Sequence, residues 1–163
     1  MANFSFNVAK GREVEFHNRV DGSDPANAVF VLVVLAALGL ELDADLKDYD
    51  TLSALLAGAS NEVTNSGYAR KILSDADIAA YTVDDDDDSI TLQLANQTFA
   101  SILAGDSWRK AILCYDSDST GGTDANIIPV KAFDVIDPLT GAAVIPAGGN
   151  IIFGFPNGYH VAR

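Results

Sequence analysis

The longest uncharged apolar run starts at Ala28, and its first part, Ala28 to Leu35, is rich in valine. β-branched residues favour strands, and a run without polar alternation is typical of a strand buried on both faces. Residues Ala36 to Leu38 suit a helix instead, and periodicity alone does not separate a buried strand from a buried helix. We favour a central strand, with Gly39 ending the element.

Strict alternation indicates a second strand at Ser89–Leu94, where the apolar residues at 90, 92 and 94 share one face and Thr91 and Gln93 the other. Residues 75–83 lead into the aspartates that precede it, and residues 159–163 form either a final short strand or a tail. Further strands are predicted, separated by turns rich in glycine, proline or aspartate, at Tyr68–Leu73, Lys110–Tyr115, Asn126–Phe133, Ala142–Ile145 and Asn150–Phe155.

Two segments have helical character. Ala9–Val20 places Val14 and His17 at helical spacing, although a strand over residues 13–20 remains an alternative. Asp50–Gly58 carries a leucine stripe at positions 52, 55 and 56, with Asp50 as the predicted N-cap and Gly58 as the closing residue. The polar segment Asp43–Tyr49 between them is predicted to be a connection.

These elements together predict a mainly β fold with one or two short helices (α+β), arranged as a β-sandwich or a Greek-key barrel. A chain of 163 residues normally forms one domain, and no shift in composition suggests a linker. We therefore expect a single domain over residues 1–163. Asp137–Gly141 is predicted to be a turn, in which Pro138 fixes one φ angle and Gly141 permits the reversal.

The charge narrows the range of partners. Ten basic against 23 acidic residues give a net charge of −13, which argues against a nucleic-acid partner and against an anionic membrane surface. The N-terminus lacks the pattern of a secretory signal, and the uncharged apolar run Ala28–Leu40 is too short to span a bilayer. We expect a soluble protein whose acidic surface either serves solubility alone or steers it to a basic partner.

Two acidic segments are candidates for cation binding. Asp84–Asp88 places five carboxylates in a row, which predicts a solvated hairpin tip, with cation binding as the alternative. In the segment 116–124, the carboxylates of Asp116, Asp118 and Asp124 are candidate Ca²⁺ ligands. That segment departs from an EF-hand loop, because Ile127 stands where the twelfth-position glutamate belongs, so an ordinary polar loop is the alternative.

Catalytic motifs are not recognisable in the chain. The single cysteine, Cys114, lies in an apolar run and is predicted to be buried, and the two histidines, His17 and His160, lie near opposite ends. Trp108 is predicted to be a core residue, with an exposed ligand-binding rim as the alternative. We therefore expect no catalytic residue, no cofactor beyond the calcium alternative, and a protein that is not an enzyme.

Two segments resemble a family. Glu62-Val63-Thr64 followed by Gly67-Tyr68-Ala69-Arg70 is similar to a segment of small virion proteins of tailed bacteriophages, and Trp108 with residues 110–124 fits the same pattern. The resemblance covers roughly residues 21 to 134. It implies a β-rich structural protein of the virion, assembled in the host cytoplasm, and it supplies no individual functional residues.

The leading hypothesis from this resemblance is a capsid decoration protein. It implies binding to the major capsid protein or other virion proteins, as a homo-oligomer or in many copies per particle. A head–tail connector or tail component is the first alternative. The second is a carbohydrate-binding or receptor-binding module that exposes Trp108 and several tyrosines.

Overall fold

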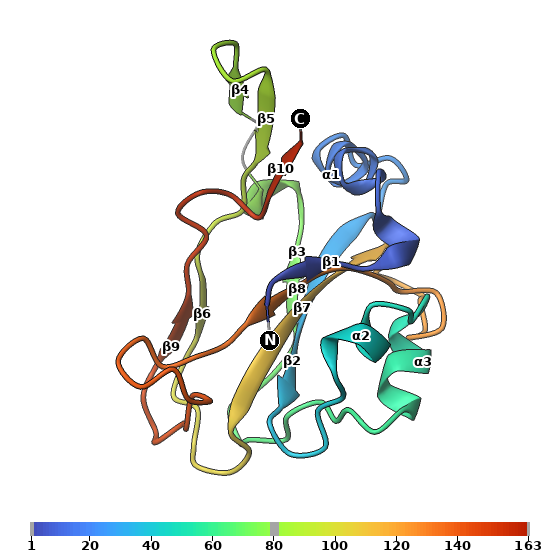
Figure 1. The fold of residues 1–163 in the computed structure, drawn as a ribbon. Coiled ribbons are helices and arrows are strands. Elements are labelled where there is room, and N and C mark those ends of the chain that lie inside the picture. Colours follow the sequence, from blue (N-terminus) through green and yellow to red (C-terminus); the bar gives the residue numbers. More distant parts are fainter. Residues whose placement is uncertain (1, 79–81, 163) are drawn as a thin grey trace.

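The fold is mainly β with short helices (α+β), as predicted (Figure 1). The computed structural model describes residues 2–78 and 82–162. Within them, the strands form one five-stranded, one three-stranded and one two-stranded sheet, all with antiparallel pairing.

The five-stranded sheet is the centre of the molecule and has the order β1-β8-β7-β2-β3. Its described edges are β1 and β3, so this sheet is open rather than closed into a barrel. The strands cover β1 (Phe4–Ser5), β8 (Ile128–Asp134), β7 (Trp108–Asp116), β2 (Val29–Ala36) and β3 (Lys71–Leu73).

Strand β2 confirms the prediction of a central strand buried on both faces. Alternate residues of a strand point to opposite faces, and β2 accordingly feeds two hydrophobic cores. Phe30, Leu32 and Val34 belong to one core, which we call the front core. Val29, Val31, Val33 and Leu35 belong to the other, the back core. The whole run must therefore be apolar.

The two small sheets also pack on the front core, to which they contribute Leu92 and Phe99, and Tyr159 joins it from the position before the last strand. One sheet pairs β4 and β10 with the two sides of β5, and the other pairs β6 with β9. The strands cover β4 (Thr82–Asp84), β5 (Ser89–Leu92), β10 (His160–Ala162), β6 (Gln97–Phe99) and β9 (Ile151–Phe153).

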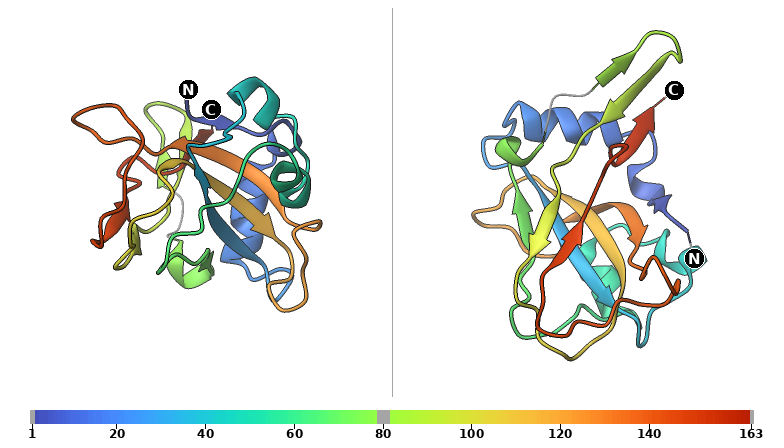
Figure 2. Two further views of the ribbon diagram at one scale, coloured as in Figure 1. Left: turned by 90° about the horizontal axis from the view of Figure 1, so that it is seen from below. Right: turned by 90° about the vertical axis from the view of Figure 1, so that its left-hand side faces the viewer.

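The hairpin β4–β5 projects from the body of the molecule and carries the aspartate run at its tip (Figures 1 and 2). Residues 84–88 are all exposed, which confirms the prediction of a solvated tip. The final strand β10 also resolves the alternative for residues 159–163, since His160–Ala162 pairs with β5. Residues 79–81 of the segment 75–83, and Arg163, lie outside the described residues.

Helices cover both faces of the central sheet. α1 lies on the front core, where Phe16 stacks on Tyr115 at a centroid distance of 4.6 Å. α2 and α3 cover the back core through Leu46, Leu52 and Leu55. The helical elements are η1 (Asn7–Ala9), α1 (Glu13–Asp21), α2 (Asp43–Leu46), α3 (Leu52–Ala57) and η2 (Asp75–Asp77). The helical interpretation of residues 13–20 is confirmed over the strand alternative.

Several local predictions are wrong. Residues 43–46 form the helix α2 rather than a connection, because burial of Leu46 in the back core stabilises the turn. The cap of α3 is Thr51 rather than Asp50, since the Thr51 hydroxyl accepts the Ala54 amide at 3.1 Å. Ala142–Ile145 forms only two isolated bridges, from Val144 to Trp108 and from Ala143 to Ile136, and Pro146 has no N–H to continue the ladder.

The strand predicted over residues 68–73 begins only at Lys71. Another segment occupies the rest of the β2 edge, because the Val63 amide donates to the Val34 carbonyl at 3.0 Å. The Tyr68 hydroxyl then accepts the Val34 amide at 3.0 Å. Residues 68–70 therefore contact β2 through a side chain rather than through a backbone ladder.

Candidate functional site

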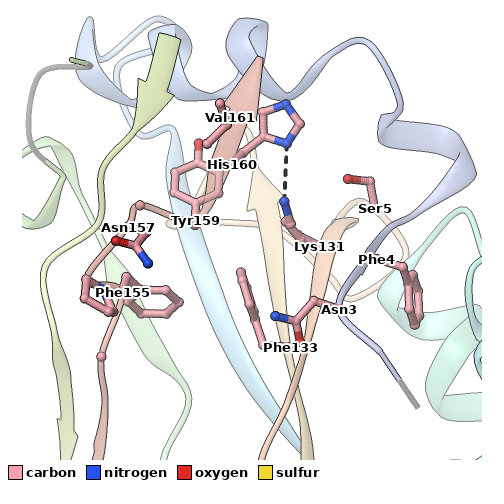
Figure 3. Close-up of a pocket in the computed structure, with 13 residues that line it drawn as sticks. Asn3, Phe4, Ser5, Lys131, Phe133, Phe155, Asn157, Tyr159, His160 and Val161 are labelled. Carbon is pink, nitrogen blue, oxygen red and sulfur yellow. Dashed lines mark hydrogen bonds between the residues drawn. The ribbon is translucent and has the colours of Figure 1, made fainter. Parts of the chain in front are cut away.

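A cleft of about 570 Å³ lies at the edge of the central sheet (Figure 3). We call it the edge cleft. Strands β1 and β8 form one wall and the C-terminal segment forms the other. Its lining consists of Asn3, Phe4, Ser5, Lys131, Phe133 and residues 154–161.

A tight turn positions the C-terminal wall. The turn lies at Asn157–Gly158, a dipeptide typical of tight turns, and Gly158 has a φ of +71°. A Cβ atom at Gly158 would lie 2.5 Å from the Leu92 carbonyl oxygen, so only glycine fits without displacement. The next residue, Tyr159, donates its amide to that same carbonyl at 2.9 Å. The turn thereby directs β10 along β5 and sets His160 above β8.

Three titratable side chains from three elements meet beside the cleft. Lys131 Nζ of β8 lies 3.3 Å from His160 Nδ1 of β10. Glu13 Oε1 of α1 lies 3.9 Å from the same His160 nitrogen. Glu13 is buried, with 5% of its surface exposed. This group places one carboxylate, one imidazole and one ammonium at the junction of three layers.

The environment lowers the pKa of both bases. Burial lowers the pKa of Lys131, and the charge of Glu13 opposes the shift. Burial is also the main cause of the lowered pKa of His160, followed by the charge of Lys131, again with Glu13 opposing. At neutral pH the imidazole is therefore neutral and its Nδ1 accepts a hydrogen bond from the Lys131 ammonium.

The walls around Lys131 are aromatic. Phe133 and Phe155 meet edge to face at a centroid distance of 5.3 Å. Tyr159 is 2% exposed, its hydroxyl lies 3.1 Å from His17 Nδ1, and burial raises its pKa, so it forms a neutral wall. A single cation beside apolar rings and amide side chains is typical of a binding site for a small molecule. The cation would bind the charged group of such a ligand, and the rings would contact its apolar part.

The predicted calcium ligands lie in and beside the loop after β7. Asp116 Oδ1 accepts the Asp118 amide at 3.0 Å. Asp118 Oδ1 accepts both the Thr120 hydroxyl, at 2.6 Å, and its amide, and these bonds lower the Asp118 pKa. Asp124 is bound by Arg70, which lowers the Asp124 pKa.

The described residues contain no group of three or more His, Cys, Asp or Glu side chains arranged to hold a metal ion. Asp116 and Asp118 are nevertheless close, since Gly122 approaches both residues and a Cβ there would lie 3.2 Å from the Asp116 carboxylate. Calcium binding at Asp116, Asp118 and Asp124 stays a prediction. The structure adds that Arg70 competes with any ion for Asp124.

The residues that carry the phage resemblance form a polar network. Arg70 donates to Glu62 Oε2 at 2.7 Å and to Asp124 Oδ1 at 2.6 Å. The Tyr68 hydroxyl donates to Glu62 Oε1 at 2.8 Å. Hydrogen bonds to Asp124 and then to Glu62 raise the pKa of the Arg70 guanidinium. The network joins the segment before β3 to the loop after β7, which is a structural role.

Trp108 and Cys114 are core residues, as predicted. Trp108 is 0% exposed and its indole nitrogen donates to Asn65 Oδ1 at 2.8 Å. Cys114 is also 0% exposed, and burial raises the pKa of its thiol. The carbohydrate-binding alternative required an exposed Trp108 and is wrong on that point, because Tyr68, Phe99 and Phe153 surround the indole ring.

The group at the edge cleft was not predicted from the sequence. Lys131 gives a local signal, since it is a charged residue in the middle of β8 with apolar residues on both sides. Glu13 and His160 lie near opposite ends of the chain and share no motif. Only the packing of α1 and β10 against β8 brings them together.

Comparison with protein-family models, curated proteins and solved structures gave no match for this chain. The fold and the edge cleft therefore define its class from the structure alone: a mainly β (α+β) protein of three antiparallel sheets, with a cleft that carries one lysine on an acidic body. None of the helices within residues 2–78 and 82–162 has the length and apolar character needed to cross a membrane.

Proposed function

We propose that this protein is a structural protein of a tailed bacteriophage virion, and specifically a decoration protein that binds the assembled head shell. The resemblance of residues 61–73 and 108–124 to small virion proteins supports this proposal. The protein acts by presenting surfaces to its neighbours rather than by transforming a substrate.

The observation that carries the proposal is a concentration of exposed apolar side chains on one part of the molecule. We call this part the outer lobe, and it consists of β6, β9 and the turns at residues 100–107 and 136–150, at the lower left of Figure 1. Five large apolar side chains are exposed there, namely Leu103 (51%), Ile136 (44%), Leu139 (94%), Ile145 (72%) and Ile152 (65%).

The two turns of the outer lobe are tied together. The Ile102 amide donates to the Gly149 carbonyl at 3.0 Å, and the Gly148 amide donates to the Ile102 carbonyl at 2.8 Å. Ile136 and Ile152 also line one small hollow of about 210 Å³. Single exposed apolar side chains are ordinary, but several gathered on one lobe indicate a surface that a partner covers.

The physical mechanism is stabilisation by mass action. A protein that binds only the assembled shell shifts the equilibrium towards that shell. Many copies on one lattice multiply modest contacts. The net charge of −13 keeps coated particles dispersed and favours a basic patch on the major capsid protein as the partner surface.

The test uses DNA-free heads assembled from the major capsid protein of the phage that carries the gene. The wild-type chain is expected to sediment with the heads and to saturate. The double variant Leu139→Asp/Ile145→Asp is expected to lose about tenfold or more in affinity, because both side chains would leave an apolar interface. Leu42→Asp is the matched control, since Leu42 is 67% exposed but lies beside α2.

Saturable binding to assembled heads, lost in the double variant and kept in the control, supports the proposal. Equal binding of all three proteins contradicts the role of the outer lobe. Electron microscopy of gold-labelled particles then separates a decoration protein, whose label covers the head, from a connector or tail component, whose label is confined to the neck or tail.

A further inference from the structure

We propose that the edge cleft is a binding site for an organic carboxylate, meaning a ligand with one ionised carboxylate and a flat apolar body. This inference is independent of the proposed function. It concerns a different surface from the outer lobe, and its test requires no head shell.

The charge of Lys131 is the first argument. Four basic side chains of the described residues, Arg12, Arg19, Arg70 and Lys110, each lie within 4.0 Å of a carboxylate. Lys131 has no carboxylate within that distance among the described residues, and neither have Lys10, Lys47, Lys71 and Arg109, but of these cations only Lys131 lines the edge cleft. The charge of Glu13 acts on Lys131 against the effect of burial without forming a direct ion pair. A half-buried ammonium without a direct ion-pair partner is costly, and an anionic ligand lowers that cost.

The position of Glu13 is the second argument. Glu13 lines a neighbouring hollow together with Val14 and Ala162 and does not line the edge cleft. Its carboxylate lies 3.9 Å from His160 Nδ1, and its charge also acts on Lys131 from that side. The charge that the edge cleft presents is therefore the Lys131 ammonium, which uses one of its three donors on His160 Nδ1 (Figure 3).

The polar lining offers further donors. Asn3 accepts the Asp134 amide with its side-chain oxygen at 2.9 Å, so its NH₂ group remains for an acceptor. Ser5 and Asn157 add a hydroxyl and a second amide. A carboxylate has about four acceptor positions and is stabilised by several such donors.

The aromatic walls and the volume of the edge cleft indicate the apolar part of the ligand. The edge-to-face pair Phe133 and Phe155 gives two ring surfaces below Lys131. The volume of about 570 Å³ lies in the range of sites for small organic molecules. The edge cleft offers one cation on a protein of net charge −13, which disfavours polyanions such as nucleic acid. A ligand with a single negative charge is therefore expected.

Such a carboxylate has two sources, a free small molecule or an acidic side chain of a neighbouring protein segment. The first arm of the experiment titrates the ¹⁵N-labelled full chain with phenylacetate, and with the neutral phenylacetamide as the matched probe. The second arm uses the peptide acetyl-Phe-Glu-Phe-amide and its glutamine analogue. Backbone amide shifts of residues 131–133 and 154–161 are the readout.

We expect saturable shifts with phenylacetate and a Kd on the order of 1 mM, as suits a ligand of about ten non-hydrogen atoms. Phenylacetamide is expected to bind about tenfold more weakly. A stronger response to the glutamate peptide than to phenylacetate identifies a protein segment as the source, and the reverse identifies a small molecule.

The variant Lys131→Met keeps the apolar stem and removes the charge, so it is expected to weaken phenylacetate binding about tenfold. Lys10→Met is the control, because Lys10 is exposed and lies outside the cleft. No saturable shift with either carboxylate, or equal binding of the acid and the amide to the wild-type chain, overturns the proposal without any need for a variant.

Discussion

The guanidinium of Arg70 holds the carboxylate of Asp124 through two parallel hydrogen bonds, of 2.6 Å and 2.9 Å, across 54 residues of chain. The same guanidinium binds Glu62 on another edge. Arg70 is 27% exposed in its side chain and Asp124 36%, so water screens the pair only in part. This pair joins the segment that carries the phage resemblance to the loop that carries the calcium prediction.

Arg70→Met is expected to lower the free energy of unfolding by about 2 kcal/mol. The variant removes a bidentate pair and leaves two carboxylates without their shared cation, and partial exposure keeps the cost below that of a fully buried pair. Urea denaturation measures the change. Arg19→Met is the control, since it breaks the exposed pair with Glu15 and is expected to leave the midpoint nearly unchanged. Equal effects of both variants would contradict a structural role for the network.

Asn65→Ala is expected to destabilise the fold by about 1–3 kcal/mol, because it leaves the buried Trp108 indole N–H without its acceptor. Asn65 also donates to the Leu103 carbonyl at 3.0 Å, so the outer lobe loses an anchor as well. Trp108 is the single tryptophan of the chain, and its fluorescence reports unfolding directly. Asn61→Ala, at an exposed position nearby, is expected to have little effect.

Stability is expected to fall when the pH drops through about 6.5, the ordinary pKa of histidine. Burial and then the charge of Lys131 lower the pKa of His160, while Glu13 opposes. Because the folded protein takes up this proton less readily than the unfolded chain, acid favours unfolding. His160→Gln is expected to show a smaller loss between about pH 7.5 and pH 5.5 in urea denaturation. An unchanged slope in that variant would argue against the lowered pKa.

Calcium binding at Asp116, Asp118 and Asp124 predicts that about 1 mM Ca²⁺ raises the midpoint of thermal unfolding, because a ligand that binds only the folded state stabilises it. Asp118→Asn should abolish the increase, whereas Asp86→Asn, in the exposed hairpin tip, should keep it. Differential scanning fluorimetry with and without a chelator measures both. A midpoint that does not respond to calcium in the wild-type chain rejects the site.

Local patterns predicted much of the fold. The valine-rich run of β2, the alternation of β5 and the aspartate tip between β4 and β5 are all present in the structure. Two of the errors fall where a distant segment decides the outcome. Val63 takes the edge of β2 beside residues 68–70, which were predicted to be part of a strand, and Leu46 forms a helical turn because a core lies beneath it.

By itself the sequence determined which segments are apolar, which alternate and which turn, because these properties depend on neighbouring residues. The tertiary structure alone decided that Lys131, His160 and Glu13 meet, and that Asp124 pairs with Arg70. Those contacts join residues that are far apart along the chain. They exist only because β10 and α1 pack on the central sheet and the Arg70 segment lies against the loop after β7, and no spacing within a single element encodes such packing.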